Sequence, residues 1–167
     1  PSNVSFVARG AVPTNEDTGT LGTWQVASRA LSFDYLWNEV RVKGGAYGVG
    51  FKHTTEGIRQ FWSFRDPNVA DTLDRYDGAA AWLANWAPTT DELTGYVVSA
   101  VAAQDAPEKP RALARRQDMQ RFKERPADWR NIIRQQELDT TTEDIRALAP
   151  ALDPSSSASG VCVFGSR

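Results

Sequence analysis

Two polar side chains that could do chemistry, Arg41 and Tyr47, stand on either side of the glycine pair Gly44-Gly45. The residues before the pair follow a helical apolar pattern, and the residues after it alternate as in a strand. The glycines therefore predict a corner in the backbone. Because a guanidinium and a phenol are both hydrogen-bond donors, such a corner could place two donors at one site.

Each of these residues also has a purely structural interpretation. A cation on the last turn of a helix is favoured by the helix dipole, which would account for Arg41. An aromatic ring in an alternating strand is typical of a core, which would account for Tyr47. From the residue types alone, both interpretations stay open.

A metal centre needs clustered ligands, and the chain has one histidine, His53, and one cysteine, Cys162. No H-E-x-x-H or H-x-x-E-H motif is present. We expect His53 to be a solvated turn residue and Cys162 to be buried in a strand. A lone cysteine cannot form an internal disulfide, which fits a reducing compartment.

Other function classes have little support. The glycines of residues 44–50 follow a helix, whereas glycines that bind phosphate open one. The net charge of −2 and the absence of a recognisable module give no reason to expect nucleic acid. Residues 109–134 hold nine basic and three acidic side chains, which we interpret as solvated helix faces, or alternatively as a surface for a partner domain or an acidic peptide. No apolar run approaches the ~20 residues of a membrane span.

The elements that must position the two donors follow from periodicity. A long helix over residues 21–43, with Gly44 as its left-handed C-cap, leads into a hairpin of residues 46–51 and 59–65. Within the first hairpin strand, alternation places Tyr47, Val49 and Phe51 on one face. The remaining elements are strands and helices over the following residues: strands 4–9 and 160–164, and helices 73–87, 90–103, 111–124, 127–138 and 142–148.

This order predicts a single α+β domain over residues 1–167, with helices packed on one face of a mostly antiparallel sheet. The chain has no initiator methionine, and its first residues lead at once into a strand. We therefore expect it to be a fragment of a longer protein. Six tryptophans are many for one small core, so we also expect an exposed apolar face through which the isolated fragment could self-associate.

The run LWNEVRVKGGAYG at 36–48, followed by SFRDPN at 63–68 and Thr72-Leu73, resembles the C-terminal region of presequence-protease-like zinc peptidases. These form a branch of the pitrilysin/insulinase superfamily. The resemblance spans roughly residues 4–110 and is most specific at R-x-K-G-G-A-Y-G. It implies a pitrilysin-type domain, the last of about four in an enzyme whose two halves close around an unfolded peptide.

The resemblance also implies roles. Zinc would be held by an inverted H-x-x-E-H motif in the first domain, which this chain lacks. Tyr47 would donate a hydrogen bond to the attacked carbonyl, and Arg41 would hold the substrate backbone, so both would be catalytic and substrate-binding. The partners would be an unfolded peptide and the N-terminal zinc-bearing domains of the same enzyme.

The leading hypothesis is thus the zinc-free C-terminal part of a zinc metalloendopeptidase that degrades oligopeptides, inactive on its own. The alternative is a non-catalytic peptide-binding or scaffold subunit that partners a separate zinc-bearing subunit. A third hypothesis, a plain α+β interaction module, requires Arg41 and Tyr47 to be buried in the core of this domain. We expect a bacterial-type cytoplasmic protein, with an organellar matrix as the alternative location.

The scarcity of ligands predicts that the isolated chain holds no stoichiometric zinc, because one histidine and one cysteine cannot complete a tetrahedral site. Elemental analysis of the purified chain after dialysis should find far less than one zinc per chain. One tightly held zinc per chain would contradict this expectation.

Overall fold

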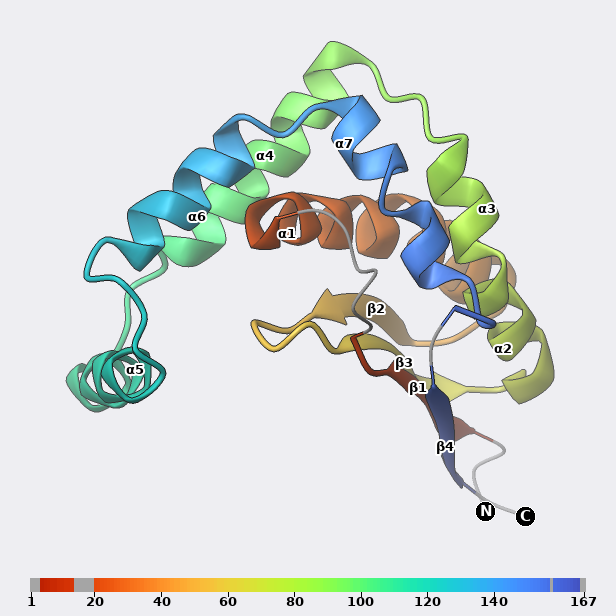
Figure 1. Ribbon diagram of the computed structural model, residues 1–167. Coiled ribbons are helices and arrows are strands. Elements are labelled where there is room, and N and C mark those ends of the chain that lie inside the picture. Colours follow the sequence, from red (N-terminus) through yellow and green to blue (C-terminus); the bar gives the residue numbers. More distant parts are fainter. Residues whose placement is uncertain (1–3, 14–19, 157, 166–167) are drawn as a thin grey trace.

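A computed structural model describes residues 4–13, 20–156 and 158–165 of the chain. Its four strands form one antiparallel sheet in the order β2-β3-β1-β4 (Figure 1). The strands are β1 (Ser5–Ala11), β2 (Gly48–His53), β3 (Arg59–Asp66) and β4 (Ser159–Gly165). The predicted α+β class is confirmed.

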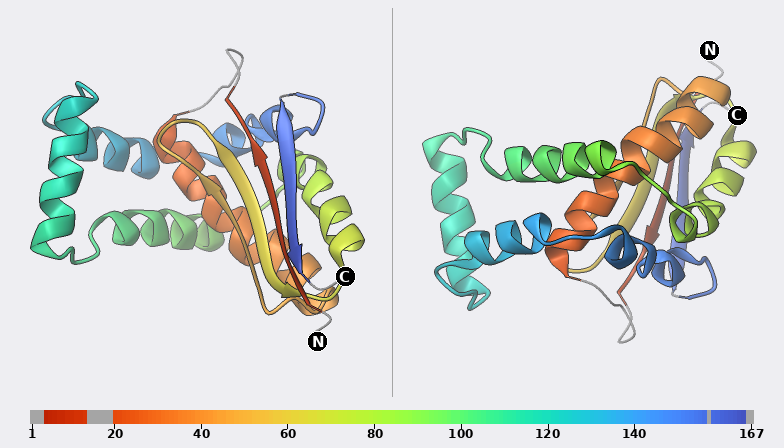
Figure 2. Two further views of the ribbon diagram at one scale, coloured as in Figure 1. Left: turned by 90° about the horizontal axis from the view of Figure 1, so that it is seen from below. Right: turned by 90° about the horizontal axis from the view of Figure 1, so that it is seen from above.

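The helices gather on one face of this sheet, and Figure 2 shows the other face uncovered by any described helix. The longest helix runs from Leu21 to Lys43, as predicted, but its second part is wound as a wider π-type helix. The helical segments are α1 (Leu21–Ala30), η1 (Leu31–Lys43), α2 (Val69–Asp77), α3 (Ala79–Ala84), α4 (Thr90–Gln104), α5 (Pro110–Phe122), α6 (Trp129–Leu138), α7 (Thr142–Arg146) and η2 (Ala149–Leu152).

The core lies between the long helix and the covered face of the sheet. Trp24 of α1 packs on Phe51 of β2, with ring centroids 6.2 Å apart, and Phe51 packs on Phe61 of β3 at 4.7 Å. The hydroxyl of Ser32 accepts a hydrogen bond from the Phe51 N–H (2.9 Å) and donates one to the Phe51 carbonyl (3.2 Å). The helix thereby satisfies backbone groups of the β2 edge strand, which would otherwise remain open to pairing.

The expected helix over 73–87 is two helices, because the chain breaks at Gly78. A side chain at this position would lie 2.5 Å from the Tyr35 hydroxyl, which itself donates a 2.7 Å hydrogen bond to the Arg75 carbonyl. The next helix begins with a capping box between Thr89 and Glu92, and this predicted start is confirmed.

The predictions for His53 and Cys162 are wrong. His53 is not solvated: it shares the covered face with Phe51, and its ring stacks on Trp24 at 4.6 Å. Cys162 is not buried, because β4 forms the outer edge of the sheet and all its residues are exposed. The register places Cys162 opposite Ala8, on the face that lacks helices.

The uncovered face carries a row of aromatic rings, which we call the aromatic row (Phe6, Tyr47, Trp62, Phe64 and Phe164). Neighbouring rings lie 5.5 to 6.5 Å apart, with Phe64 at the centre. Phe164 is 74% exposed and Phe6 53%. The expectation of an exposed apolar face is confirmed, while self-association through it stays a prediction.

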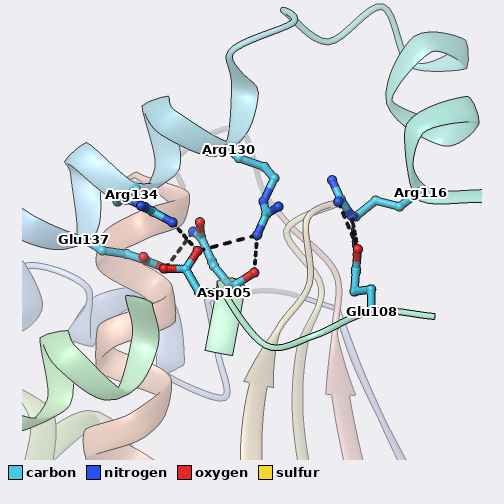
Figure 3. A network of polar contacts seen from close by, with 7 residues as sticks. Asp105, Glu108, Arg116, Arg130, Arg134 and Glu137 are labelled. Carbon is cyan, nitrogen blue, oxygen red and sulfur yellow. Dashed lines mark hydrogen bonds and ion pairs between the residues drawn. The ribbon is translucent and has the colours of Figure 1, made fainter. Parts of the chain in front are cut away.

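The basic region forms the helices α5 and α6, as predicted, but α5 stands apart from the body of the domain (Figure 1). None of its residues is buried. Figure 3 shows how ion pairs fasten the neighbouring segments: Arg130 and Arg134 of α6 converge on Asp105 at the end of α4. Lys123, just after α5, pairs with Glu56 of the β2–β3 turn.

Beneath these ion pairs lies a fully buried carboxyl group, that of Glu137 on α6. Its Oε1 atom accepts a 3.0 Å hydrogen bond from the Gln104 side chain, while Oε2 has no partner. Burial raises the pKa of Glu137, against the opposing effect of the Gln104 hydrogen bond and of nearby arginines. The group therefore prefers its neutral form more strongly in the folded chain than in the unfolded chain.

This preference predicts a pH-dependent stability. Because folding raises the pKa, the folded state holds its proton at pH values where the unfolded state has lost it, so stability falls as pH rises above ~4.3, the unfolded pKa of a glutamate. Replacing Glu137 with Gln removes this loss of stability. The melting temperature of Glu137→Gln, relative to that of the wild type, should therefore rise between pH 4 and pH 7. The relative melting temperature of Glu124→Gln, at an exposed position, should stay constant over this range. A gap that is constant over this range would contradict the account.

Candidate functional site

The corner between η1 and β2 is built by the end of the π-type helix. The Arg41 carbonyl accepts hydrogen bonds from Gly44 and Gly45, and the Val40 carbonyl accepts one from Ala46 at 3.2 Å. The left-handed residue is Gly45, with φ +81°, and not Gly44 as predicted. Gly44 is right-handed, but a side chain there would lie 2.5 Å from the Val40 carbonyl oxygen. The wider winding of the helix moves the left-handed position one residue onward.

A second segment clamps this corner from outside the helix. The Asn68 side chain donates a 2.8 Å hydrogen bond to the Gly44 carbonyl. Pro67 lies against Gly45, 3.5 Å from where a side chain would start. The corner is thus fixed to the segment that follows β3. Asn68, which makes this hydrogen bond, lies 24 residues after Gly44 in the chain.

The clamp depends on one buried carboxylate, that of Asp66, which is 1% exposed. It accepts hydrogen bonds from three groups: the Ser63 hydroxyl (2.6 Å), the Thr72 hydroxyl (2.7 Å) and the Asn68 backbone N–H (2.9 Å). These bonds join the last residues of β3 to the first turn of α2. A buried carboxylate is stable only with such partners, so Asp66 holds the local geometry tightly.

The corner brings the two predicted donors together. The Arg41 guanidinium lies 4.1 Å from the Trp37 ring centroid, one turn earlier on the helix, and 5.6 Å from the Tyr47 ring centroid. Both distances are typical of cation–π contacts. Trp37 was not predicted as part of the site, although its spacing of four from Arg41 on a helix could have suggested it.

Tyr47 does not lie where alternation placed it. Val49 and Phe51 face the core, whereas Tyr47 is 58% exposed and packs on Phe64 of the aromatic row at 5.5 Å. The reason is that β2 begins only at Gly48, so the alternation does not extend to Tyr47. The interpretation of Tyr47 as a core aromatic is wrong.

A second arginine, Arg65, joins the site and was missed by the sequence analysis. Its guanidinium carbon lies 5.4 Å from the Tyr47 ring centroid. Among the described residues, neither Arg41 nor Arg65 pairs with a carboxylate. The site therefore offers one phenol and two uncompensated positive charges at the surface.

Within the described ranges, no group of three or more histidine, cysteine, aspartate or glutamate side chains could hold a metal ion. The residues of the corner are donors and cations, which do not fit a zinc site. A hollow of about 480 Å³ lies at the other end of the long helix, between α4, α5 and α6. Its lining mixes apolar side chains, such as Met119, Trp129 and Ile133, with polar and charged ones, including Glu108 and Glu137. Of the described helices, none is long and apolar enough to span a membrane.

Comparison with known sequences gives one consistent result. A sequence model of the PreP C-terminal domain matches residues 1–164. Protein HypA of Clostridium perfringens is 37% identical over 105 residues, which are 63% of this chain and 11% of that protein. Presequence protease 1, chloroplastic/mitochondrial, of Arabidopsis thaliana is 29% identical over 155 residues, which are 92% of this chain and 14% of that protein. The chain thus spans a small part of the length of these relatives.

Solved structures agree on the fold. A peptidase M16 inactive domain from Pseudomonas fluorescens superposes with a TM-score of 0.70 over 98% of this chain and 40% of that one. Its sequence identity is 18%, so the likeness concerns the fold alone.

The clamp predicts a specific weakness. Replacing Asp66 with Ala leaves two buried hydroxyls and one N–H without their acceptor, so the free energy of unfolding should fall by about 3 kcal/mol. Asp71→Ala, at an exposed position on the first turn of α2, should change it by less than about 1 kcal/mol. Urea unfolding of both variants measures the difference, and equal losses would show that Asp66 is not the anchor of the corner.

Proposed function

Because the chain belongs to the PreP C-terminal domain family, we propose that it is the zinc-free C-terminal part of a zinc metallopeptidase that degrades unfolded oligopeptides. In this proposal the corner contributes Arg41 and Tyr47 to the active site of the full-length protein. The observation that carries it is the exposure of the Tyr47 phenol beside two guanidiniums that have no acidic partner among the described residues.

The zinc belongs elsewhere in this proposal. The described part of the chain contains no cluster of metal ligands, and the chain covers only 11% and 14% of two relatives. We take residues 1–167 as one domain whose partners are the preceding zinc-bearing domains and the peptide. The isolated domain should then be inactive, because it lacks the metal.

The role of Tyr47 follows from its chemistry. When a peptide carbonyl is attacked, negative charge develops on its oxygen, and a preorganised O–H donor at that point stabilises the transition state. The phenol of Tyr47 is such a donor, and its ring is held by Phe64 and Arg41. Because the donor is in place before the reaction, little reorganisation is needed when the charge forms.

The role of Arg41 is to bind the substrate backbone. Its guanidinium carbon lies 4.1 Å from the Trp37 ring centroid, and it has no carboxylate partner among the described residues. The free N–H groups can donate to peptide carbonyls, and the planar fork favours paired acceptors. Arg41 therefore orients the peptide, while Tyr47 acts on the reacting oxygen.

The alternative is a zinc-free peptide-binding or scaffold subunit that partners a separate zinc-bearing subunit. The match to a solved domain described as an inactive peptidase domain keeps this alternative in view. The two differ in the gene, since only an enzyme would encode H-x-x-E-H before Pro1. For location we propose the bacterial cytoplasm, with the organellar matrix as the alternative, since the relatives include a bacterial protein and a chloroplastic/mitochondrial one.

In the full-length protein, Tyr47→Phe should lower kcat about 10²-fold and leave KM nearly unchanged, because the change deletes only the O–H group. Tyr96→Phe is the matched control: this ring packs at a tilt against Trp86, 5.8 Å between centroids, and removing its hydroxyl should leave turnover unchanged. Steady-state cleavage of a fluorogenic peptide measures both. A Tyr47→Phe protein with wild-type kcat would remove Tyr47 from the chemistry.

Arg41→Ala in the same protein should lower kcat and raise KM, because the proposal gives Arg41 contacts to the substrate both before and during the reaction. Arg41→Lys should recover part of the affinity, since it keeps the charge but loses the planar fork. An effect of Arg41→Ala on stability alone, with unchanged kinetics of the folded fraction, would return Arg41 to the structural role of a helix-end cation.

A further inference from the structure

Arg65 has an unusual backbone. Its φ of +48° lies in the left-handed region, which among the described non-glycine residues is shared only with Glu124. A residue with a side chain is strained there, and such strain persists only where the surroundings enforce it. Glycine or asparagine would fit this conformation better. The backbone conformation at this position therefore does not favour an arginine.

The strain comes from a bulge in the sheet. Ser5 of β1 pairs with Asp66 and Val7 pairs with Ser63, so two residues of β3, Phe64 and Arg65, stand opposite one residue of β1. A bulge redirects side chains that regular alternation would send to the other face. Here it brings Arg65 to the face that carries the aromatic row, where its guanidinium meets the Tyr47 ring.

Backbone and side chain of Arg65 both act on Tyr47. The Arg65 carbonyl accepts a hydrogen bond from the Tyr47 N–H at 3.4 Å, and the guanidinium carbon lies 5.4 Å from the ring centroid. The next residue, Asp66, is the buried anchor of the corner clamp. The bulge therefore cannot relax without breaking the hydrogen bonds that hold the corner.

Apart from this contact, the Arg65 guanidinium has no hydrogen-bond or ion-pair partner among the described residues. It is exposed, and no carboxylate or carbonyl among the described residues accepts a hydrogen bond from it. Its guanidinium makes a cation–π contact with Tyr47, which Arg41 also approaches at 5.6 Å. Two cations beside one phenol ring fix the ring and place positive charge near the oxygen to which the phenol would donate.

We propose that Arg65 is a positioning residue for Tyr47. The strained bulge holds the Arg65 guanidinium against the Tyr47 ring and so fixes the phenol. The positive charge of the guanidinium also stabilises the negative charge that develops at the reacting oxygen. This inference deepens the proposed function and rests on it. It predicts that the strain at Arg65 contributes to turnover at the expense of stability.

The test uses the full-length protein with Arg65→Gly, which relieves the backbone and removes the guanidinium. The melting temperature should stay equal or rise, kcat should fall about tenfold, and KM should change by less than about twofold. Arg65→Lys, which keeps the charge, should recover part of kcat. Glu124→Gly is the matched control, because it relieves the other left-handed residue and should leave kcat unchanged.

A double-mutant cycle separates positioning from direct contact with substrate. In a Tyr47→Phe background, Arg65→Gly should change kcat by less than about twofold, because the O–H group through which it acts is already gone. Fully additive losses would overturn the positioning role, as would wild-type kcat in Arg65→Gly or a change confined to KM.

A structural readout keeps this inference distinct from the proposed function. A crystal structure of the Arg65→Gly protein should show the Tyr47 ring displaced or in more than one orientation. An unmoved Tyr47 ring would overturn the positioning role whatever the kinetics. Conversely, wild-type turnover of Tyr47→Phe with a displaced ring in Arg65→Gly would overturn the proposed function while leaving the contact between the two residues intact.

Discussion

The buried carboxylate of Asp66 is the interaction on which the rest of the site depends. It gathers two hydroxyls and one backbone N–H within 2.6 to 2.9 Å, and so joins the end of β3 to the start of α2. That junction carries Asn68, which holds the Gly44 carbonyl, and Arg65, which contacts Tyr47. One side chain thus fixes the junction of β3 and α2, whose contacts with Gly44 and Tyr47 exist only in the folded chain. Because a buried charge without partners is strongly unfavourable, its network leaves the corner little freedom.

The arrangement of helices on one face gives the corner its exposure. The long helix buries one face of the sheet and satisfies backbone groups of the β2 edge strand. The other face of the sheet carries no helix among the described elements. Side chains that a further layer on this free face would cover are left at the surface, from Tyr47 through the aromatic row to Phe164. In a longer protein such a face can receive a neighbouring domain or a peptide. The position of Tyr47 at one end of the row places the proposed chemistry beside this apolar surface.

Local signals predicted most of the fold. The helical periodicity of residues 21–43, the capping box at Thr89 and the alternation on either side of residues 52–58 predicted elements that the structure contains. Local signals failed where the decisive contact is distant in sequence. The apolar run around Cys162 predicted burial, but the strand lies at a sheet edge, and His53 was drawn under α1 by its place beside Phe51.

The candidate site shows the same limit. The closeness of Arg41 and Tyr47 could be predicted because both lie beside one glycine pair, while their catalytic roles stay a prediction. The family resemblance that the run 36–48 indicated is confirmed by the PreP C-terminal domain match. The exposure of Tyr47 and the presence of Arg65 could not be predicted, because they depend on a π-type helix end and on a bulge set by pairing with β1.

The most direct test of the central claim is a crystal structure of the full-length protein with a bound phosphonamidate peptide, whose phosphoryl oxygen mimics the charged oxygen of the transition state. The account predicts that the Tyr47 hydroxyl lies about 2.7–3.1 Å from that oxygen, with Arg41 on the peptide backbone. A Tyr47 side chain packed against another domain, out of reach of the inhibitor, would contradict it.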